Sequence, residues 1–552
     1  MTRSRGHWWT LFALITVLSG CAAPGATAPA RAVNGAGDTN PVDPSLLADG
    51  GNLRWPVQTY PANFNGLHID SNAGGVAQVA DAVMPQLVRT AADGSIAPNP
   101  DYLTSFTLVS TSPQVVSYKL NPRARWSDGT PITWVDVRSQ WQALNLRDPG
   151  YRPLRSTGYA EIADVAKGAD EFEAVVTFAI PFAEWTPLFQ DLYPASLTRD
   201  PEVFNTGWRE KPAVTAGPFR LAQLDPVART VIVERDPNWW GRRPRLERIT
   251  FRAMATHAET DALENGDIDL TEIAGDINKF QRVTSMQGVE VRRTVASAVQ
   301  EIQFNGAPGA ILADRELRKA LMRGIDRATI ATALTGQIVP TAAPSGNHLY
   351  PVGLRGYRDN SAVVAYDPAA AARRLDELGW KRDGDGKRRK DGKELVIRDV
   401  TPDDWRRQEA LLVQNQLGQL GVRVEIDTVP LNDFFAKYVN KGDFDVAHIG
   451  RGMVPSSPIY YTAPFYMRVA ATQMNYGRMG NDYINQLYER AKRELDENKR
   501  IALANEIDRA VWDEGFSLPL YGRPWVYGVR AKLANIGASV ATDDLTAVGF
   551  VK

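Results

Sequence analysis

Histidines and paired carboxylates are the residues of this chain whose types could support catalysis or metal binding. The chain has five histidines. His7 lies in the N-terminal signal-like segment, and the other four, His68, His257, His348 and His448, are scattered along the sequence. They form no HExxH motif and no spacing suited to zinc. Asp443 and Asp445 alternate in a strand–turn segment, where such a pair more often faces solvent than supports hydrolysis. Because GxSxG, Walker and GxGxxG motifs are also lacking, we expect no catalytic residues, no metal and no cofactor.

Cys21 is the only cysteine in the 552 residues and ends an apolar run that follows two arginines, as in a secretory signal. A run of about eleven residues cannot span a bilayer, which needs roughly 20 in a helix. Leu-Ser-Gly-Cys resembles the lipobox of bacterial lipoproteins, in which the thiol carries a diacylglyceryl group. This resemblance implies that residues 1–20 are removed and that Cys21 is a lipid anchor at the extracytoplasmic face of the cell membrane. The other interpretation is an incidental cysteine in an ordinary signal peptide.

Composition separates a tether from a globular body. Residues 21–47 are rich in Ala, Gly, Pro and Asn and poor in large apolar residues, so we expect a flexible tether there. The whole chain has 63 basic and 64 acidic residues, a balance that argues against a nucleic-acid partner. Its length predicts several structural units, and we expect the protein to be a monomer.

Strand-like and helical segments alternate along the body, which is typical of an α/β fold. TVIVERD and VRVEIDTV are strand-like, whereas DPAAAARRLDELG is helical. One helix is predicted from Asp314 to a stop at Gly336, and a second opens at Asp367-Pro368, where the aspartate is the N-cap. Thr133 is predicted to cap another. Residues 414–450 follow the order helix, strand, helix, strand, which predicts a crossover in a mixed sheet.

Four segments carry a recognisable combined pattern. Residues 215–270 contain a Gly-Pro-aromatic turn, two strands, an Asn-Trp-Trp-Gly turn and a helix ending in Gly-Asp-Ile-Asp. The others are RARWSDGTPITWVDV at 123–137, IQFNGAPGAILADRELRKALMRGIDR at 302–327 and FDVAHIG at 444–450. Together they resemble the bacterial extracellular solute-binding proteins of family 5, the oligopeptide and dipeptide receptors of ABC importers. The Ala- and Arg-rich composition is similar to that of actinobacterial members.

This resemblance implies a two-lobed periplasmic-binding-protein-like α/β fold of type II, cluster C, with mixed sheets and an extra third domain. Lobe I would comprise 48–82, 204–302 and 517–552, the extra domain 83–203, and lobe II 303–516. Hinges are expected near 299–305 and 516–521. In the family, closure of the lobes traps the ligand and creates a shape that the permease subunits recognise.

The sequence departs from the family where peptide receptors bind the amino terminus of their ligand. Those receptors continue the strand that corresponds to FDVAHIG with a Gly-Trp pair and, three residues later, an aspartate. Here Arg451 replaces the tryptophan and Val454 the aspartate. A peptide ammonium buried against Val454 would lack a counter-charge, which argues against an ordinary free peptide. Arg451 is expected either to bind a carboxylate, phosphate or sugar oxygen of the ligand or to form a salt bridge with a neighbour such as Asp443 or Asp445.

The resemblance and the aromatic segments that follow the departure yield a set of expected ligand-binding residues: Asn305, Trp405, Arg451, Tyr460, Tyr461, Phe465 and Tyr521. For Asn305, hydrogen bonds within the local turn are an equal alternative. The predicted function is that of a membrane-anchored solute-binding protein of an ABC importer, with a peptide or peptide-like ligand. The alternative is a cell-envelope protein that binds a glycolipid or another non-peptide ligand and has no role in nutrient uptake.

Overall fold

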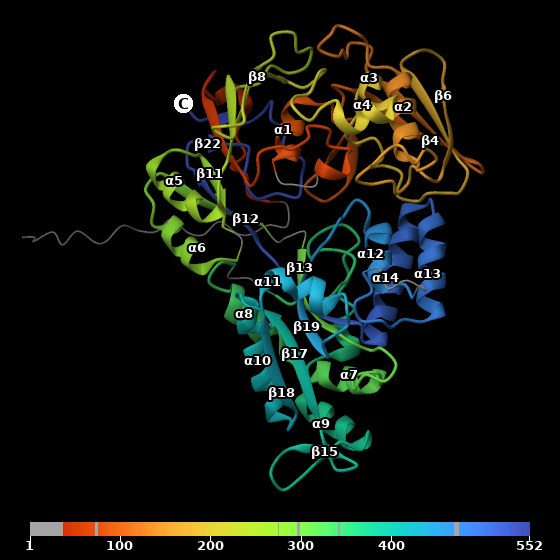
Figure 1. Ribbon diagram of the computed structural model, residues 1–552, viewed down its shortest axis with the longest axis vertical. Helices are drawn as coiled ribbons and strands as arrows, with labels where there is room; N and C mark the ends of the chain where they lie inside the picture. Colours follow the sequence, from red (N-terminus) through yellow and green to blue (C-terminus); the bar gives the residue numbers. More distant parts are fainter. Residues whose placement is uncertain (1–36, 72–74, 274, 295–297, 340–342, 469–473) are drawn as a thin grey trace, which may run out of the picture. The chain divides into compact units, whose positions relative to one another are not determined.

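The computed structural model describes residues 37–71, 75–273, 275–294, 298–339, 343–468 and 474–552 (Figure 1). These residues belong to one compact unit, Val33–Lys552. The predicted anchor Cys21 and most of the predicted tether lie outside the described residues. Among the described residues, no helix is both long and apolar enough to cross a membrane.

Two four-stranded sheets share the first large hydrophobic core, which contains side chains such as Leu53, Tyr118 and Phe251. The first sheet has the order β1 (Asn52–Val57), β10 (Arg248–Ala253), β9 (Thr230–Arg235) and β8 (Phe219–Asp225), with β1 and β10 parallel. The second is antiparallel and has the order β4 (Leu103–Thr111), β5 (Gln114–Leu120), β7 (Glu173–Phe178) and β6 (Ile162–Lys167). The helices of this region are α1 (Val76–Val83), α2 (Trp134–Leu144), α3 (Ala195–Thr198) and α4 (Pro201–Thr206).

A five-stranded mixed sheet organises the second large core. Its order is β18 (Arg423–Val429), β17 (Val396–Pro402), β19 (Val446–Gly452), β13 (Ala298–Phe304) and β20 (Ser517–Gly522). β17 is parallel to β18 and β19, so the predicted crossover over residues 414–450 is confirmed. The accompanying helices are α7 (Arg315–Arg323), α8 (Arg327–Thr335), α9 (Pro368–Glu377), α10 (Arg406–Gln419), α11 (Leu431–Asp433), α12 (Pro458–Tyr466), α13 (Asp482–Arg493) and α14 (Glu497–Glu514). Figure 1 shows α10 beside β17 and β18.

A three-stranded sheet with its own small core adjoins the end of β20 along the chain. Its order is β11 (Leu270–Glu272), β21 (Trp525–Arg530) and β12 (Val289–Thr294), and it packs with α5 (Glu259–Asn265) and α6 (Ile277–Thr284). The remaining strands are short: β2 (Val88–Thr90) with β3 (Ile96–Pro98), β14 (Lys381–Arg382) with β15 (Arg388–Lys390) and β16 (Lys393–Glu394), and β22 (Leu533–Ala534) with β23 (Gly549–Phe550).

Local capping chemistry explains where several helices begin. Asp367 accepts a hydrogen bond from the Ala370 N–H and Pro368 opens α9, as predicted. Thr133 caps α2, as predicted. The single helix predicted from Asp314 to Gly336 is wrong: α7 ends before Gly324, and Asp326 caps the separate helix α8. An internal capping aspartate ended the first helix early.

The predicted hinge segments lie largely within paired strands. Val299–Phe304 belongs to β13, which is hydrogen-bonded to both β19 and β20, and Ser517–Tyr521 belongs to β20. A central strand with partners on both sides cannot change its backbone angles freely. Between β20 and β21, the described chain crosses from the five-stranded to the three-stranded sheet at Arg523 and Pro524, directly after Gly522.

Candidate functional site

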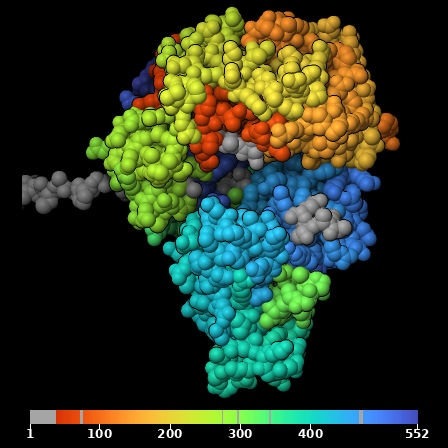
Figure 2. All heavy atoms as spheres, viewed as in Figure 1, coloured from red at the N-terminus to blue at the C-terminus, as the bar shows by residue number. Residues whose placement is uncertain are grey.

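A cavity of about 320 Å³ lies where four segments meet. Its walls come from the start of α6, the end of α8, the start of α10 and the crossing that follows β20. Two predicted ligand-binding residues, Trp405 and Tyr521, are brought together here although they are far apart in sequence. Leu334, Ile277 and Pro524 add apolar surface. Figure 2 shows the molecular surface hollowed between the segments coloured red, green and cyan.

Arg523 is the cationic side chain in the wall of this cavity. Its backbone N–H donates to the carbonyl of Ala298 at 2.9 Å, which fixes the crossing next to β13. Its guanidinium lies 5.7 Å from the ring centre of Trp405, a cation–π distance. Within the described part of the chain, the guanidinium makes no hydrogen bond and has no carboxylate within 4.0 Å. Sequence reasoning missed this residue.

A buried polar group lies on the same face of the five-stranded sheet as the cavity. Glu409 of α10 accepts hydrogen bonds from the Tyr521 hydroxyl and, at 3.0 Å, from Gln300 Nε2. His448 contacts Glu409 through Nδ1 at 2.9 Å and Asp399 through Nε2 at 3.2 Å. Burial alone would lower the pKa of His448, but the two carboxylates raise it to about 10. The imidazole is therefore charged at neutral pH and fixes Tyr521 through Glu409.

Arg451 lies on the opposite face of the same sheet, where protein atoms surround its side chain and its Nη1 has no hydrogen-bond partner among the described residues. Its guanidinium pairs with Glu301 at 3.3 Å, donates to the His348 carbonyl at 2.9 Å, and lies 5.5 Å from the Phe465 ring centre. Only 3% of Arg451 is exposed. Arg451 thus forms a structural salt bridge, as in the second alternative, but its partner is Glu301. The example partners Asp443 and Asp445 are bonded to Arg398.

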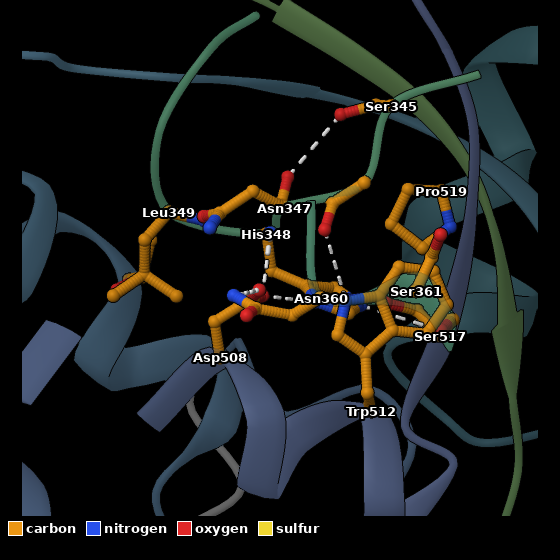
Figure 3. Close-up of polar contacts among 12 residues, drawn as sticks. Ser345, Asn347, His348, Leu349, Asn360, Ser361, Asp508, Trp512, Ser517 and Pro519 are labelled. Atoms are coloured by element: carbon orange, nitrogen blue, oxygen red, sulfur yellow. Dashed lines mark hydrogen bonds and ion pairs between the residues drawn. The ribbon is translucent and has the colours of Figure 1, made fainter. Parts of the chain in front are cut away.

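A network of buried polar groups continues from the Arg451 contact. The His348 Nδ1 and its backbone N–H both lie 2.7 Å from Asp508 Oδ1, and Nε2 lies 3.3 Å from the Ser517 carbonyl. Figure 3 shows the imidazole held between Asp508 and Ser517, with Asn360 beside the same carboxylate. Ser517 also donates to Glu301 at 3.2 Å. This arrangement holds β20, α14 and the segment around residue 348 together.

The remaining predicted residues serve local packing in this structure. Asn305 Oδ1 accepts a hydrogen bond from the Ala307 N–H at 3.2 Å, which is the contact of the local-turn alternative. Its Nδ2 donates to the carbonyls of Gly442 and Phe444 at 3.1 and 2.9 Å, in a segment remote in sequence. Tyr461 and Phe465 contact each other, with ring centres 5.9 Å apart. Tyr460 packs against Phe182 at 4.4 Å, away from the cavity that contains Trp405.

Glu184 provides a contact between the two large cores that the sequence did not reveal. Its carboxylate accepts hydrogen bonds from Ser457 Oγ at 2.5 Å, from the Ile459 N–H at 2.8 Å and from the Tyr460 N–H at 3.1 Å. It therefore caps the N-terminus of α12, where a negative charge is favoured. Burial raises the pKa of Glu184, and these hydrogen bonds oppose the increase. A second cavity of about 300 Å³ adjoins this contact.

Three carboxylates gather near α1. Desolvation by the surrounding protein atoms and repulsion from Asp191 and Asp543 raise the pKa of Asp81 to about 8, and Gln86 Nε2 donates to it at 2.6 Å. Desolvation raises the pKa of Asp191 to about 6 and that of Asp543 to about 7. Asp81 and Asp191 are nevertheless exposed at the surface, and Asp543 is partly buried. Their separation in sequence left no signal that they would lie close together. No cluster among the described residues could hold a metal ion.

The family-model comparison matches residues 97–472 to "Bacterial extracellular solute-binding proteins, family 5 Middle". The oligopeptide-binding protein OppA of Mycobacterium tuberculosis is 42% identical, with 99% of this chain and 94% of the relative covered. The probable monoacyl phosphatidylinositol tetramannoside-binding protein LpqW of the same organism is 31% identical over only 43% of this chain and 37% of the relative.

Solved structures show the same fold. A periplasmic EDTA-binding protein, EppA, superposes with a TM-score of 0.83 at 23% identity, covering 95% of this chain and all of that one. The oligopeptide-binding protein AppA of Bacillus subtilis, in complex with a nonapeptide, superposes with a TM-score of 0.69 at 19% identity, covering 92% and 100%. The predicted fold class, a periplasmic-binding-protein-like α/β fold with several sheets and domains, is confirmed.

Proposed function

Because the chain belongs to the bacterial extracellular solute-binding proteins of family 5, we propose that it captures oligopeptides outside the cell and delivers them to an ABC permease. The observation that carries the proposal is the 42% identity to a mycobacterial oligopeptide-binding protein over 99% of this chain. The family consists of transporter substrate-binding proteins, so the expectation that the chain is not an enzyme is confirmed. The predicted actinobacterial type agrees with these mycobacterial relatives.

The cavity beside Trp405 and Tyr521 supports this proposal. It combines aromatic and aliphatic walls with a few polar groups, which suits the side chains of an extended peptide. Although Val454 replaces the expected aspartate, Asp81, Asp191 and Asp543 near α1 would supply carboxylates for a peptide ammonium. An ammonium would lower the pKa of these groups, since it favours their charged form.

Closure around the peptide would take place by rotation at the crossing formed by Arg523 and Pro524. This proposal includes the predicted division into domains. Lobe I comprises residues 48–82, 204–302 and 517–552, lobe II comprises 303–516, and the extra domain comprises 83–203. The two large hydrophobic cores support the separation of lobe II from the other two units, although the second core also includes Ile302, Leu518, Leu520 and Tyr521 at the proposed lobe I boundaries. The first core joins lobe I with the extra domain, since Leu53 and Tyr118 both belong to it. The Glu184 contact with α12 would then stabilise the closed form.

Membrane attachment through Cys21 is the second part of the proposal. Its support is the lipobox-like Leu-Ser-Gly-Cys segment after a short apolar run. In a bacterium that expresses the full chain, Cys21→Ala should move the protein from the membrane fraction to the medium. Ser19→Ala is a matched control in the same segment and should leave it on the membrane. Retention of the Cys21→Ala protein would contradict lipid anchoring.

The ligand class can be tested directly on protein purified from its native host. Denaturing extraction followed by mass spectrometry should release a mixture of short peptides. Acyl or sugar masses would favour the glycolipid alternative, for which the partial similarity to LpqW is the supporting observation. Their recovery without peptides would overturn the proposal.

A further inference from the structure

Arg523 has the features of a ligand-binding cation rather than of a structural one. We propose that its guanidinium binds a carboxylate of the ligand, either the free carboxyl terminus or an acidic side chain of a peptide. The inference rests on the proposed function and specifies which chemical group the cavity selects.

The first observation is that other arginines around this site have partners and Arg523 does not. Arg406 pairs with Asp404 at 2.6 Å, and Arg327 donates to the carbonyls of Ser345 and Pro519 at 2.7 and 2.9 Å. The half-buried Arg523 guanidinium has neither an acceptor nor an ion-pair partner among the described residues. A guanidinium carries five donors, and leaving them unused inside a cavity is unfavourable unless water or a ligand accepts them.

The acidic side chains nearest to this part of the cavity are engaged or too distant to form an ion pair. Asp276 contributes to the wall, but its carboxylate accepts the N–H groups of Asn278 and Lys279, both at 2.9 Å. Burial raises the pKa of Glu272, and the charge of Arg523 opposes this increase without forming a salt bridge within 4.0 Å. Neither carboxylate therefore replaces an anionic ligand.

The second observation is that the surrounding residues leave room for the guanidinium and hold its orientation. A Cβ atom added at Gly450 would lie 3.2 Å from Arg523 Nη1 and 3.2 Å from Gln300 Oε1. Gln300 is fully buried, and this oxygen has no hydrogen-bond partner within the described part of the chain. The absence of a side chain at Gly450 thus allows Arg523 to lie over the sheet, while the Trp405 ring covers the guanidinium.

Carboxylate binding follows from this arrangement. A planar guanidinium donates two parallel hydrogen bonds to a carboxylate, which an ammonium cannot do. The apolar walls lower the local dielectric constant, so a charged hydrogen bond contributes more there than at the surface. The adjoining apolar residues Leu334 and Pro524 would then contact the side chain that carries or precedes the acid.

A purely structural role for Arg523 makes a different prediction. With His448 protonated, the buried group of Asp399, Glu409 and His448 carries one net negative charge, which Arg523 would balance at longer range. In that case Arg523 would affect folding stability but would not distinguish ligands that differ only in a carboxylate.

The experiment compares three pools of random pentapeptides with the full-length protein freed of bound peptide. The first pool has free carboxyl termini and no Asp or Glu, the second is the same pool amidated, and the third is amidated with one Glu in every member. Affinities are measured by calorimetry for wild type, Arg523→Gln, Arg523→Lys and the exposed-surface control Arg490→Gln.

Wild type should bind the first pool at least about tenfold more tightly than the second, since charged hydrogen bonds are the strong ones. Recovery of that affinity in the third pool would identify an acidic side chain as a second source of the carboxylate. Arg523→Gln should remove the preference, Arg523→Lys should restore part of it, and Arg490→Gln should keep it.

Equal wild-type affinity for all three pools would overturn the inference and leave the peptide-binding function intact. An equal loss in all three pools for Arg523→Gln would also overturn it, since that is the structural role. The wild-type comparison needs no variant, so misfolding of Arg523→Gln cannot hide the result. If wild type binds none of the pools, the proposed function fails and the inference fails with it.

Discussion

The two faces of the five-stranded sheet each bear an arginine, and the two side chains have opposite environments. On one face, Arg451 is 3% exposed, pairs with Glu301 and donates to the His348 carbonyl. On the other face, Arg523 lines the 320 Å³ cavity, and its guanidinium lies over the Trp405 ring without a hydrogen bond or ion pair to any described residue. Sequence reasoning selected Arg451 as a ligand-binding residue and missed Arg523. The difference teaches that the partners already present decide whether a buried cation is available to a ligand.

Buried polar atoms without hydrogen-bond partners occur on both faces. Among the described residues, Gln300 Oε1, Asp399 Oδ1 and Thr401 Oγ1 lack partners on the Arg523 face, and Arg451 Nη1 and the Tyr466 hydroxyl lack them on the Arg451 face. The carboxylates of Glu301 and Asp508 on the Arg451 face each accept several hydrogen bonds. Unsatisfied atoms therefore do not distinguish the two faces, and the difference rests on the ion-pair partner that Arg451 has and Arg523 lacks within the described part of the chain.

The largest expected effect comes from Arg451→Met. Removing one member of a buried ion pair leaves Glu301 uncompensated and should lower the free energy of unfolding by about 3–5 kcal/mol. Denaturant unfolding measures this change, and the double variant Arg451→Met/Glu301→Met should recover most of it. Weakened peptide binding by Arg451→Met without loss of stability would instead restore Arg451 as a ligand-binding residue and break the comparison.

The second-largest expected effect is on the pH dependence of stability, which should differ between variants on the two faces of the sheet. The pKa of His448 is raised from 6.5 to about 10, so the stability it contributes is complete below pH 6.5 and is lost as the pH rises through 10. Between pH 7 and 10.5, the stability difference between wild type and His448→Gln should shrink by at least about 1.4 kcal/mol, the equivalent of one pKa unit.

Arg451→Met is the matched control for this measurement. Glu301 holds the pKa of Arg451 above its ordinary value even though burial opposes it, so this guanidinium remains charged throughout. The difference between wild type and Arg451→Met should accordingly stay constant over the same pH range. If the stability difference between wild type and His448→Gln also stayed constant over this pH range, His448 would not be protonated beneath the cavity.

The smallest effect is expected from Trp405→Leu. The ring is 40% exposed, so its loss should change stability by less than about 1 kcal/mol. It should weaken the binding of free-acid peptides about two- to fivefold, because an exposed cation–π contact contributes about 0.5–1 kcal/mol. Calorimetric titration measures this change, with Phe435→Leu as the control at another exposed aromatic residue. An unchanged affinity would show that the indole does not orient Arg523.

Local chemistry made part of the fold predictable. An aspartate followed by proline was enough to locate the start of α9, and Thr133 with Asp136 located that of α2. The crossover of β18 and β19 around β17 followed from the order of strands and helices alone. The break between α7 and α8 was missed because Asp326 caps a helix within a run that otherwise continues a helical pattern.

The sequence by itself determined the family, the α/β class and several helix starts, because motifs, periodicity and capping act between residues that are close along the chain. Only the tertiary structure decided the partners of the arginines. Glu301 lies 150 residues from Arg451, and Trp405 meets Arg523 because α10 and the crossing after β20 adjoin the same cavity. Charge satisfaction depends on distances of a few ångströms between remote segments, and strand pairing sets those distances.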